Sequence, residues 1–276
     1  MDAKMQRRIQ RYGWDKAAER YETGWKASLA PAQAALVAEA NAQPGERVVD
    51  LACGTGLVTL RLAEAVGPHG EVVGADISQA MVDTLKRCAC AQGLHHIRAI
   101  RSDAESLPRF ASGRADLVTC ALGLMYVADP EAAIGEAFRM LKPGGRCVVA
   151  VWGNRAACGW ADIFPIVDAR VKSTVCPMFF RLGTGRALEG ALKGAGFEAI
   201  HLNRLNTTLP YGDDRAALSA AFEAGPVALA YSRFDAATRA DVHREYLSSI
   251  SPFWQSGGYR IPGEFVIARG TKPCRE

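Results

Sequence analysis

The chain has 276 residues, of which 49% are hydrophobic and 22% charged, and its 33 basic and 29 acidic residues give a formal net charge of +4. Such a chain can bury a large core, so the composition excludes a disordered protein, and the small basic excess does not indicate a nucleic-acid partner. No apolar run reaches the length of a membrane span, and the polar N-terminus does not resemble a signal peptide. We therefore expect a soluble cytoplasmic protein.

The first 43 residues have the composition of helices. We expect two helical segments, residues 14–25 and 31–43, with Pro31 in the first turn of the second. The densest basic cluster of the chain precedes them, and its helical spacing is typical of a solvated helix face rather than a polyanion site. This cluster consists of Lys4, Arg7, Arg8 and Arg11.

Strands and helices alternate through the next hundred residues. The expected strands cover residues 47–52, 71–77, 97–103, 115–124 and 146–153. The expected helices cover residues 56–67, 78–93 and 130–145, the last of them ended by the Pro-Gly-Gly at 143–145. Ser78 is a suitable N-cap for the second of these helices. Several of the strands are apolar throughout, which indicates a parallel sheet covered on both faces.

The pattern changes after residue 153. Residues 154–180 are irregular and aromatic, and a helix over 185–196 leads into a strand over 197–211. A helical stretch over 213–250 then precedes a last strand at 260–270. Ligands of such sheets bind beyond the carboxyl ends of the strands, so this helical insertion is placed to cover them.

We expect a single domain over residues 1–276. Residues 1–43 would form an N-terminal helical cap, 44–151 a cofactor-binding half and 152–276 a substrate-side half. Within the last part, a lid would extend over about 213–256.

The eight cysteines are scattered and lack the paired spacing of a metal site. Cys53, Cys120 and Cys147 lie in or beside apolar runs, which favours buried free thiols in a reducing compartment. We therefore expect no metal.

The stretch "VVDLACGTG", residues 48–56, joins a buried strand to a glycine-rich turn. A dinucleotide-binding turn needs a third glycine where this chain has Thr59, and the Gly-Lys-Ser/Thr of a phosphate-binding loop is absent. S-adenosylmethionine has no phosphate and suits a turn of small residues. Asp76, at the end of the second strand and 26 residues after Asp50, can accept hydrogen bonds from both ribose hydroxyls.

The chain resembles the class I S-adenosylmethionine-dependent methyltransferases, in the small-molecule branch similar to ubiquinone/menaquinone C-methyltransferases. Five segments between residues 48 and 151 carry the resemblance in order: "VVDLACGTG", "GADIS", "SDAESLP", "ADLVTCALGLMYVADP" and "LKPGGRCVVAV". It implies an α/β fold with a doubly wound, seven-stranded, mostly parallel, Rossmann-like sheet.

The resemblance also implies a set of cofactor-binding residues. Asp50 orders the loop near the methionine ammonium or simply caps the turn. Ile77 and Met81 sandwich the adenine or are ordinary core residues, and Tyr21 closes over the cofactor or packs its helix. The full set comprises Tyr21, Asp50, Ala52, Gly54, Thr55, Gly56, Asp76, Ile77, Met81, Asp103, Ala104 and Cys120.

The fourth segment departs from the family. Many relatives have Leu-His-His where this chain has Leu124-Met125-Tyr126. Tyr126 is therefore the candidate catalytic residue. A phenol with a pKa near 10 is a poor general base at neutral pH, so its role would be to orient the acceptor, unless it is only a packed tyrosine. Aromatic residues that could form an apolar acceptor chamber are Trp152, Trp160, Phe164, Tyr211, Phe222, Tyr231 and Trp254.

The resulting hypothesis is an enzyme that transfers a methyl group from S-adenosylmethionine by in-line displacement to a small apolar or aromatic metabolite, leaving S-adenosylhomocysteine. One alternative is methylation of a soft nucleophile, a thiol or arsenite, near Cys53, Cys158 or Cys176. Another is a cofactor-binding regulatory protein without transfer activity. The acceptor atom and the oligomeric state are not predicted.

Overall fold

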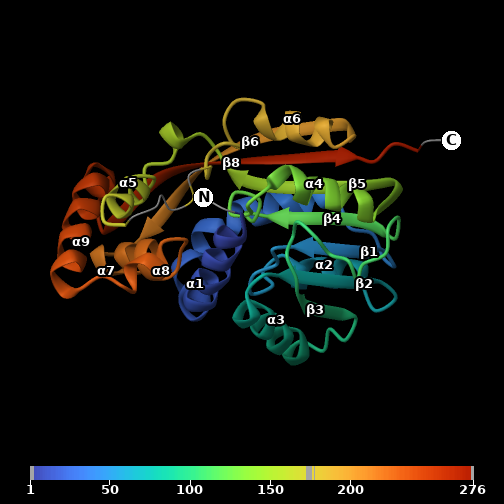
Figure 1. Cartoon of the computed structure of the whole chain (residues 1–276), viewed down its shortest axis with the longest axis horizontal. Helices are drawn as coiled ribbons and strands as arrows, with labels where there is room; N and C mark the ends of the chain where they lie inside the picture. Colours follow the sequence, from blue (N-terminus) through green and yellow to red (C-terminus); the bar gives the residue numbers. More distant parts are fainter. Residues whose placement is uncertain (1–2, 172–175, 177, 275–276) are drawn as a thin grey trace.

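A mixed sheet forms the centre of the computed structural model, which describes residues 3–171, 176 and 178–274. Within those residues the strand order is β3-β2-β1-β4-β5-β8-β6, and a short β7 pairs with β8 at the side (Figure 1). The parallel strands are β1 (Arg47–Leu51), β2 (Glu71–Asp76), β3 (Ile97–Arg101), β4 (Ala115–Ala121) and β5 (Leu141–Trp152). The antiparallel strands are β6 (Glu198–Tyr211), β7 (Trp254–Gln255) and β8 (Gly258–Thr271).

This architecture confirms the predicted Rossmann-like fold class. Seven strands form the continuous path, and β7 is an addition of two residues that the sequence pattern did not predict. In β1 every residue from Val48 to Leu51 is buried, as expected for a parallel strand covered on both faces.

Helices α2 (Thr59–Val66), α3 (Gln79–Ala91), α4 (Pro130–Met140) and α6 (Ala187–Gly194) flank the sheet. Ser78 caps α3 as predicted, because its hydroxyl accepts a hydrogen bond from the Met81 N–H. The next helix ends before the Pro-Gly-Gly at residues 143–145, as the sequence predicts. α4 ends at Met140 and β5 begins at once, because Pro143 cannot continue a helix. The pairing of β4 with β5 shifts register here, between Ala115 and Leu117.

The N-terminal segment is one helix, α1 (Ala3–Ala40), so the prediction of two helices was wrong. Pro31 lies inside it and removes one backbone donor. Buried residues on both sides of Pro31 pack against the core and offset that loss, among them Leu29 and Leu36. At the end of the helix, Arg146 Nε donates to the Ala40 carbonyl at 2.6 Å.

The insertion between β6 and β8 is helical, as its pattern predicts. It contains α7 (Asp214–Leu218), the π-helical η2 (Ser219–Glu223), α8 (Ala228–Tyr231), α9 (Ala236–Ile250) and the 3-10 turn η3 (Ser251–Phe253). Before β6 lie the 3-10 turn η1 (Arg155–Ala157) and α5 (Ile163–Asp168). In Figure 1, α7, α8 and α9 gather at one end of the molecule, with α1 between them and strands β1 to β4.

The insertion packs closely on α1. A Cβ atom on Gly24 would lie 2.7 Å from Ala224 Cβ, so only glycine permits this approach. Arg20 of α1 pairs with Glu223 of η2 at 2.9 Å. Within the residues that the structure describes, no helix is both long and apolar enough to cross a membrane.

Candidate active site

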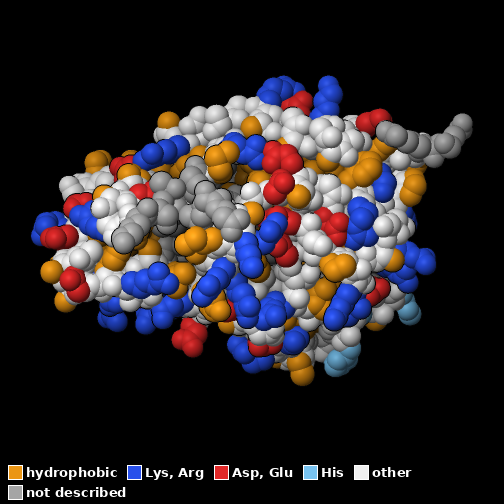
Figure 2. Space-filling view, viewed as in Figure 1, with side chains coloured by type: hydrophobic (Ala, Val, Ile, Leu, Met, Phe, Trp, Pro, Cys, Tyr) orange, Lys and Arg blue, Asp and Glu red, His pale blue; other side chains and the backbone are white. Residues whose placement is uncertain are grey.

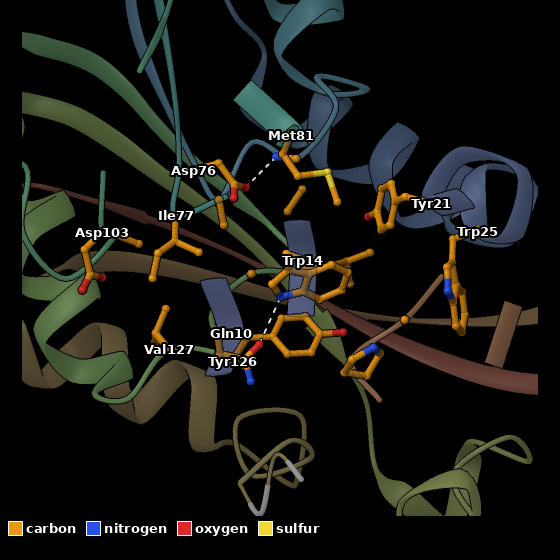
Figure 3. Close-up of a pocket in the computed structure, with 18 of the residues that line it drawn as sticks. Gln10, Trp14, Tyr21, Trp25, Asp76, Ile77, Met81, Asp103, Tyr126 and Val127 are labelled. Carbon is orange, nitrogen blue, oxygen red and sulfur yellow. Dashed lines mark hydrogen bonds between the residues drawn. The ribbon is translucent and has the colours of Figure 1, made fainter. Parts of the chain in front are cut away.

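A pocket lies at the carboxyl ends of the parallel strands. Its walls come from α1, from the loops that follow β1 to β5, and from Gly225 and Pro226 of the insertion (Figure 3). Since β2, β1, β4 and β5 are consecutive in the sheet and neighbouring strands lie about 4.8 Å apart, the ends of β2 and β5 are separated by about 14 Å. The pocket is therefore elongated across the sheet.

Asp76 marks one end of this pocket. Its two carboxylate oxygens accept hydrogen bonds from the backbone N–H groups of Gly54 and Ser78, each at 2.9 Å. Burial raises the pKa of Asp76 to about 6, although these hydrogen bonds oppose the shift. Each oxygen retains acceptor capacity for a ligand hydroxyl.

Two ion-pair and hydrogen-bond clusters fix α1 over this end. Asp15 accepts hydrogen bonds from the Ser78 hydroxyl at 2.6 Å and from the Ala80 N–H at 3.2 Å. Arg7 pairs with Asp103 at 2.8 Å and also with Glu105. The prediction of a solvated face was therefore wrong for Arg7, because its guanidinium binds two carboxylates of the third motif.

Lys4 and Arg8 of the same basic cluster are exposed. Figure 2 shows Lys and Arg side chains gathered on this face of the molecule around α1.

Asp50 lies under the glycine-rich turn rather than in the main pocket. Its carboxylate accepts hydrogen bonds from the Thr59 hydroxyl at 2.6 Å and the Thr119 hydroxyl at 2.7 Å. Burial raises its pKa to about 6. Asp50 and Thr55 border a small adjoining cavity, and Thr55 Oγ1 is buried without a partner among the described residues.

The two glycines of the turn have different surroundings. Both have positive φ, 54° at Gly54 and 98° at Gly56. A Cβ on Gly56 would lie 2.5 Å from Leu85 Cδ1, so packing within the protein requires glycine there. Beside Gly54 the nearest atom to such a Cβ is Tyr21 Cε1 at 4.0 Å, because that space belongs to the pocket.

Most of the predicted site residues line the main pocket, and a few do not. Gly56 and Cys120 do not line it; Cys120 is buried in β4, and its neighbours Ala121 and Leu122 form the wall instead. The predicted residues that do line it are Tyr21, Ala52, Gly54, Asp76, Ile77, Met81, Asp103, Ala104 and Tyr126.

The far part of the pocket is aromatic. Trp14 makes edge contacts with Tyr126 and Tyr21, at ring-centroid distances of 4.9 and 5.9 Å. Trp160 contacts Trp152 at 4.7 Å and Trp25 at 5.8 Å. Burial raises the pKa of Tyr126 well above its usual value, so its phenol stays protonated at neutral pH.

Of the aromatic residues predicted to form an acceptor chamber, Trp152 and Trp160 line the pocket. Trp254 is half exposed, and Phe222 and Tyr231 pack inside the insertion, where the Tyr231 hydroxyl and His243 Nε2 are 2.9 Å apart. Among the described residues, none of those lining the pocket is a histidine. His, Cys, Asp and Glu side chains in the described part of the chain form no group of three suited to a metal.

Known proteins match both the motifs and the fold. Residues 48–145 match the family model of a methyltransferase domain. A ubiquinone/menaquinone biosynthesis C-methyltransferase of Stutzerimonas stutzeri is 41% identical over 183 residues, which cover 59% of this chain and 70% of that protein. The chain belongs to the class I S-adenosylmethionine-dependent methyltransferase family.

Other matches to this chain are partial or distant. A demethylmenaquinone methyltransferase of Geobacillus stearothermophilus is 41% identical over 124 residues, covering 45% of this chain and 53% of the relative. The chain thus spans about half the length of the curated relatives that it matches first. A Haemonchus contortus phosphoethanolamine N-methyltransferase, in complex with phosphomonomethylethanolamine and S-adenosylhomocysteine, has a TM-score of 0.63 at 15% identity. The match covers 97% of this chain and 60% of that chain, and it shows a similarity of fold alone.

The sequence motifs of this chain did not identify the contribution of α1 beyond Tyr21. A signal was present, because pocket residues recur at intervals of three, four or seven, which places them on one helix face. These residues are Arg7, Gln10, Trp14, Tyr21, Trp25 and Leu29.

Proposed function

We propose that this protein transfers the methyl group of S-adenosylmethionine to a small apolar, partly aromatic metabolite. One observation carries the proposal: a single pocket joins Asp76 and Asp103 at one end to the tryptophans at the other. The polar end suits a nucleoside, and the aromatic end suits an apolar acceptor.

The residues of the polar end fit the cofactor. Asp76 would hold the ribose hydroxyls, Ile77 and Met81 the adenine faces, and Asp103 with the Ala104 backbone the adenine edge. The space beside Gly54 would admit the methionine part. The unpartnered Thr55 hydroxyl, in the adjoining cavity, is a further polar group for that part.

When bound, the cofactor would supply a methyl group on a sulfonium; the C–S electron pair would stay on sulfur, and an electron pair of the acceptor would form the new bond. An acceptor that is protonated loses its proton to solvent. The protein contributes orientation, which in a fully positioned arrangement supplies up to roughly 7–11 kcal/mol of the barrier. Tyr126 would orient the acceptor, and α1 with the insertion, acting as the lid, would exclude water.

The cysteines do not support the alternative in which the acceptor is a thiol or arsenite. Burial raises the pKa of Cys158 to about 11 and that of Cys176 to about 12, so neither thiol is ionised at neutral pH. Neither Cys53, Cys158 nor Cys176 lines the main pocket.

Turnover separates the enzyme from a cofactor-binding regulator. Purified protein is incubated with S-adenosylmethionine and one of three acceptors: reduced demethylmenaquinone with a short isoprenoid tail, dithiothreitol or arsenite. We expect S-adenosylhomocysteine to form with the first acceptor alone. Cofactor binding without turnover of any acceptor would favour the regulator, and turnover of dithiothreitol or arsenite would favour the soft-nucleophile enzyme.

The raised pKa of Asp76 predicts a pH dependence of cofactor binding. Below about pH 6 this carboxyl is protonated and loses acceptor capacity for the ribose. We expect S-adenosylhomocysteine affinity to fall from pH 7 to pH 5, by up to about tenfold per pH unit. Calorimetric titration across this range tests it, and the weaker-binding Asp76→Asn variant should show a smaller fall in affinity, because only Asp50 still titrates near pH 6 there.

The stability of the free protein should change in the opposite direction. The carboxyls of Asp50 and Asp76 bind protons more tightly when folded, since their pKa values rise from 3.8 to about 6. Their contribution to the free energy of unfolding is fully present below pH 3.8 and is lost as pH rises through 6. Parallel loss of affinity and stability between pH 7 and pH 5 would contradict the assignment.

A further inference from the structure

Two indole N–H groups at the aromatic end of the pocket have no hydrogen-bond partner in the described part of the chain. They belong to Trp25 and Trp160, whose side chains are almost fully buried, with 7% and 3% of their surfaces exposed. Neither Nε1 atom has a partner among the described residues. Both residues line the pocket, and their rings lie 5.8 Å apart at nearly right angles.

The residues described in the neighbouring wall provide no side-chain acceptor for these donors. Leu29, Trp152, Gly225 and Pro226 line the same region, and none of their side chains can accept a strong hydrogen bond. Gly225 lies close to one donor, because a Cβ there would be 3.5 Å from Trp25 Nε1.

The indole N–H of Trp14, which lines the same pocket, does have a hydrogen-bond partner. Its Nε1 donates to Gln10 Oε1 at 3.1 Å, so this indole is satisfied by the protein. Buried donors are nearly always paired in folded proteins, since an unpaired one loses its hydration without compensation. A ligand that brings an acceptor atom to this wall would therefore satisfy the two unpaired donors.

These two donors lie at the end of the pocket expected to hold the methyl acceptor, away from the end expected to hold the cofactor. Trp152 ends β5, three strands away from Asp76 at the end of β2. In Figure 3, Trp25 lies at the opposite side of the pocket from Asp103. The ionisable groups Arg7, Asp76, Asp103 and Glu105 that line the pocket come from the start of α1 and the loops after β2 and β3.

We propose that the N–H groups of Trp25 and Trp160 bind an oxygen of the methyl acceptor, so that the acceptor class is an apolar ring system carrying a carbonyl or an ionised hydroxyl. This inference rests on the proposed function, because it places the acceptor in this pocket. Indole N–H groups are neutral and only donate, so they select for an acceptor oxygen and against an ammonium group. They also stabilise negative charge that develops on that oxygen.

Tryptophan NMR tests the proposal without requiring turnover. The chain has five tryptophans, and ¹⁵N labelling gives one Nε1–H signal for each. The protein is first saturated with S-adenosylhomocysteine, then titrated with 1-tetralone or with tetralin, which has the same rings without the carbonyl. We expect tetralone to move the Trp25 and Trp160 signals downfield and to bind about tenfold more tightly, a difference of about 1.4 kcal/mol.

Variants assign the effect to the two donors. Trp25→Phe and Trp160→Phe identify the signals, and 3-benzothienylalanine at either position keeps the ring shape while removing the N–H. Each replacement should reduce the preference for tetralone over tetralin. Trp254→Phe is the matched control, because Trp254 is half exposed and lies outside the pocket. The Trp14 signal should stay in place.

The outcomes distinguish this proposal from the proposed function. If S-adenosylhomocysteine binds but tetralone leaves the Trp25 and Trp160 signals unmoved, or binds no better than tetralin, the donor assignment is wrong and the methyltransferase proposal stands. If S-adenosylhomocysteine does not bind, the proposed function fails. Equal preference for tetralone in the 3-benzothienylalanine variants would also overturn the donor assignment.

Discussion

S-adenosylhomocysteine is expected to bind the Asp76→Ala variant at least about 100-fold more weakly than the unaltered protein. The variant loses the acceptor for two ribose hydroxyls, and hydrogen bonds to a charged group contribute roughly 1.5–3 kcal/mol each. A loss of about 2.8 kcal/mol already corresponds to 100-fold. Calorimetric titration at pH 7.5, where Asp76 is ionised, measures the change.

Two further variants control this experiment. Asp83→Ala removes a half-exposed carboxylate of α3 that lies outside the pocket, and its affinity should be unchanged. Asp76→Asn keeps one acceptor oxygen and should give an intermediate affinity. Thermal unfolding must be followed as well, since the N–H groups of Gly54 and Ser78 lose their acceptor in Asp76→Ala. A folded Asp76→Ala protein with unchanged affinity would refute the ribose assignment.

Gly183→Ala is expected to lower the free energy of unfolding by about 3 kcal/mol, at the upper end of the cost of overpacking. The added methyl group would collide with the carbonyl oxygen of Trp152 and lie 2.6 Å from that of Gly153. These are backbone atoms at the end of β5, which cannot rotate away as a side chain can. Urea unfolding followed by circular dichroism measures the loss.

Gly190→Ala is the matched control, with an effect of opposite sign. Gly190 lies inside α6, and no atom of the described residues comes within 4 Å of the position of an added Cβ. Alanine favours a helix over glycine by roughly 0.5–1 kcal/mol, so this variant should be more stable. Equal stabilities of the two variants would show that the backbone around Gly183 adapts freely.

Local sequence patterns predict the parallel half of the sheet well, for identifiable reasons. The apolar run at Val48 and Val49 is buried on both faces, and the cap at Ser78 depends on residues three positions apart. The errors arose where tertiary contacts override local preference. Pro31 remains inside α1 because the helix packs against the core along its length, and nothing near Pro31 in the sequence encodes that packing.

The candidate site also has a part that the sequence predicts and a part that it does not. Asp76 and Gly54 belong to contiguous motifs, so their residue types and spacing could predict their positions. The pairing of Arg7 with Asp103 joins residues almost a hundred positions apart, and the burial of Trp25 against Trp160 depends on α1 crossing the sheet. Such long-range contacts leave only a weak trace in one sequence, here the helical recurrence of the pocket residues of α1.

Pro31 also separates the pocket-lining part of α1, here called the arm, from the last turns of the helix. Ala32, Leu36 and Ala40, after the proline, have no exposed surface, whereas every pocket residue of α1 precedes it. A helix bends most readily where a proline removes a backbone hydrogen bond. Because one arm covers both ends of the pocket, its bending would uncover both at once. We therefore expect the demethylated cofactor and the methylated product to leave with a common rate constant, set by the flexing of this joint.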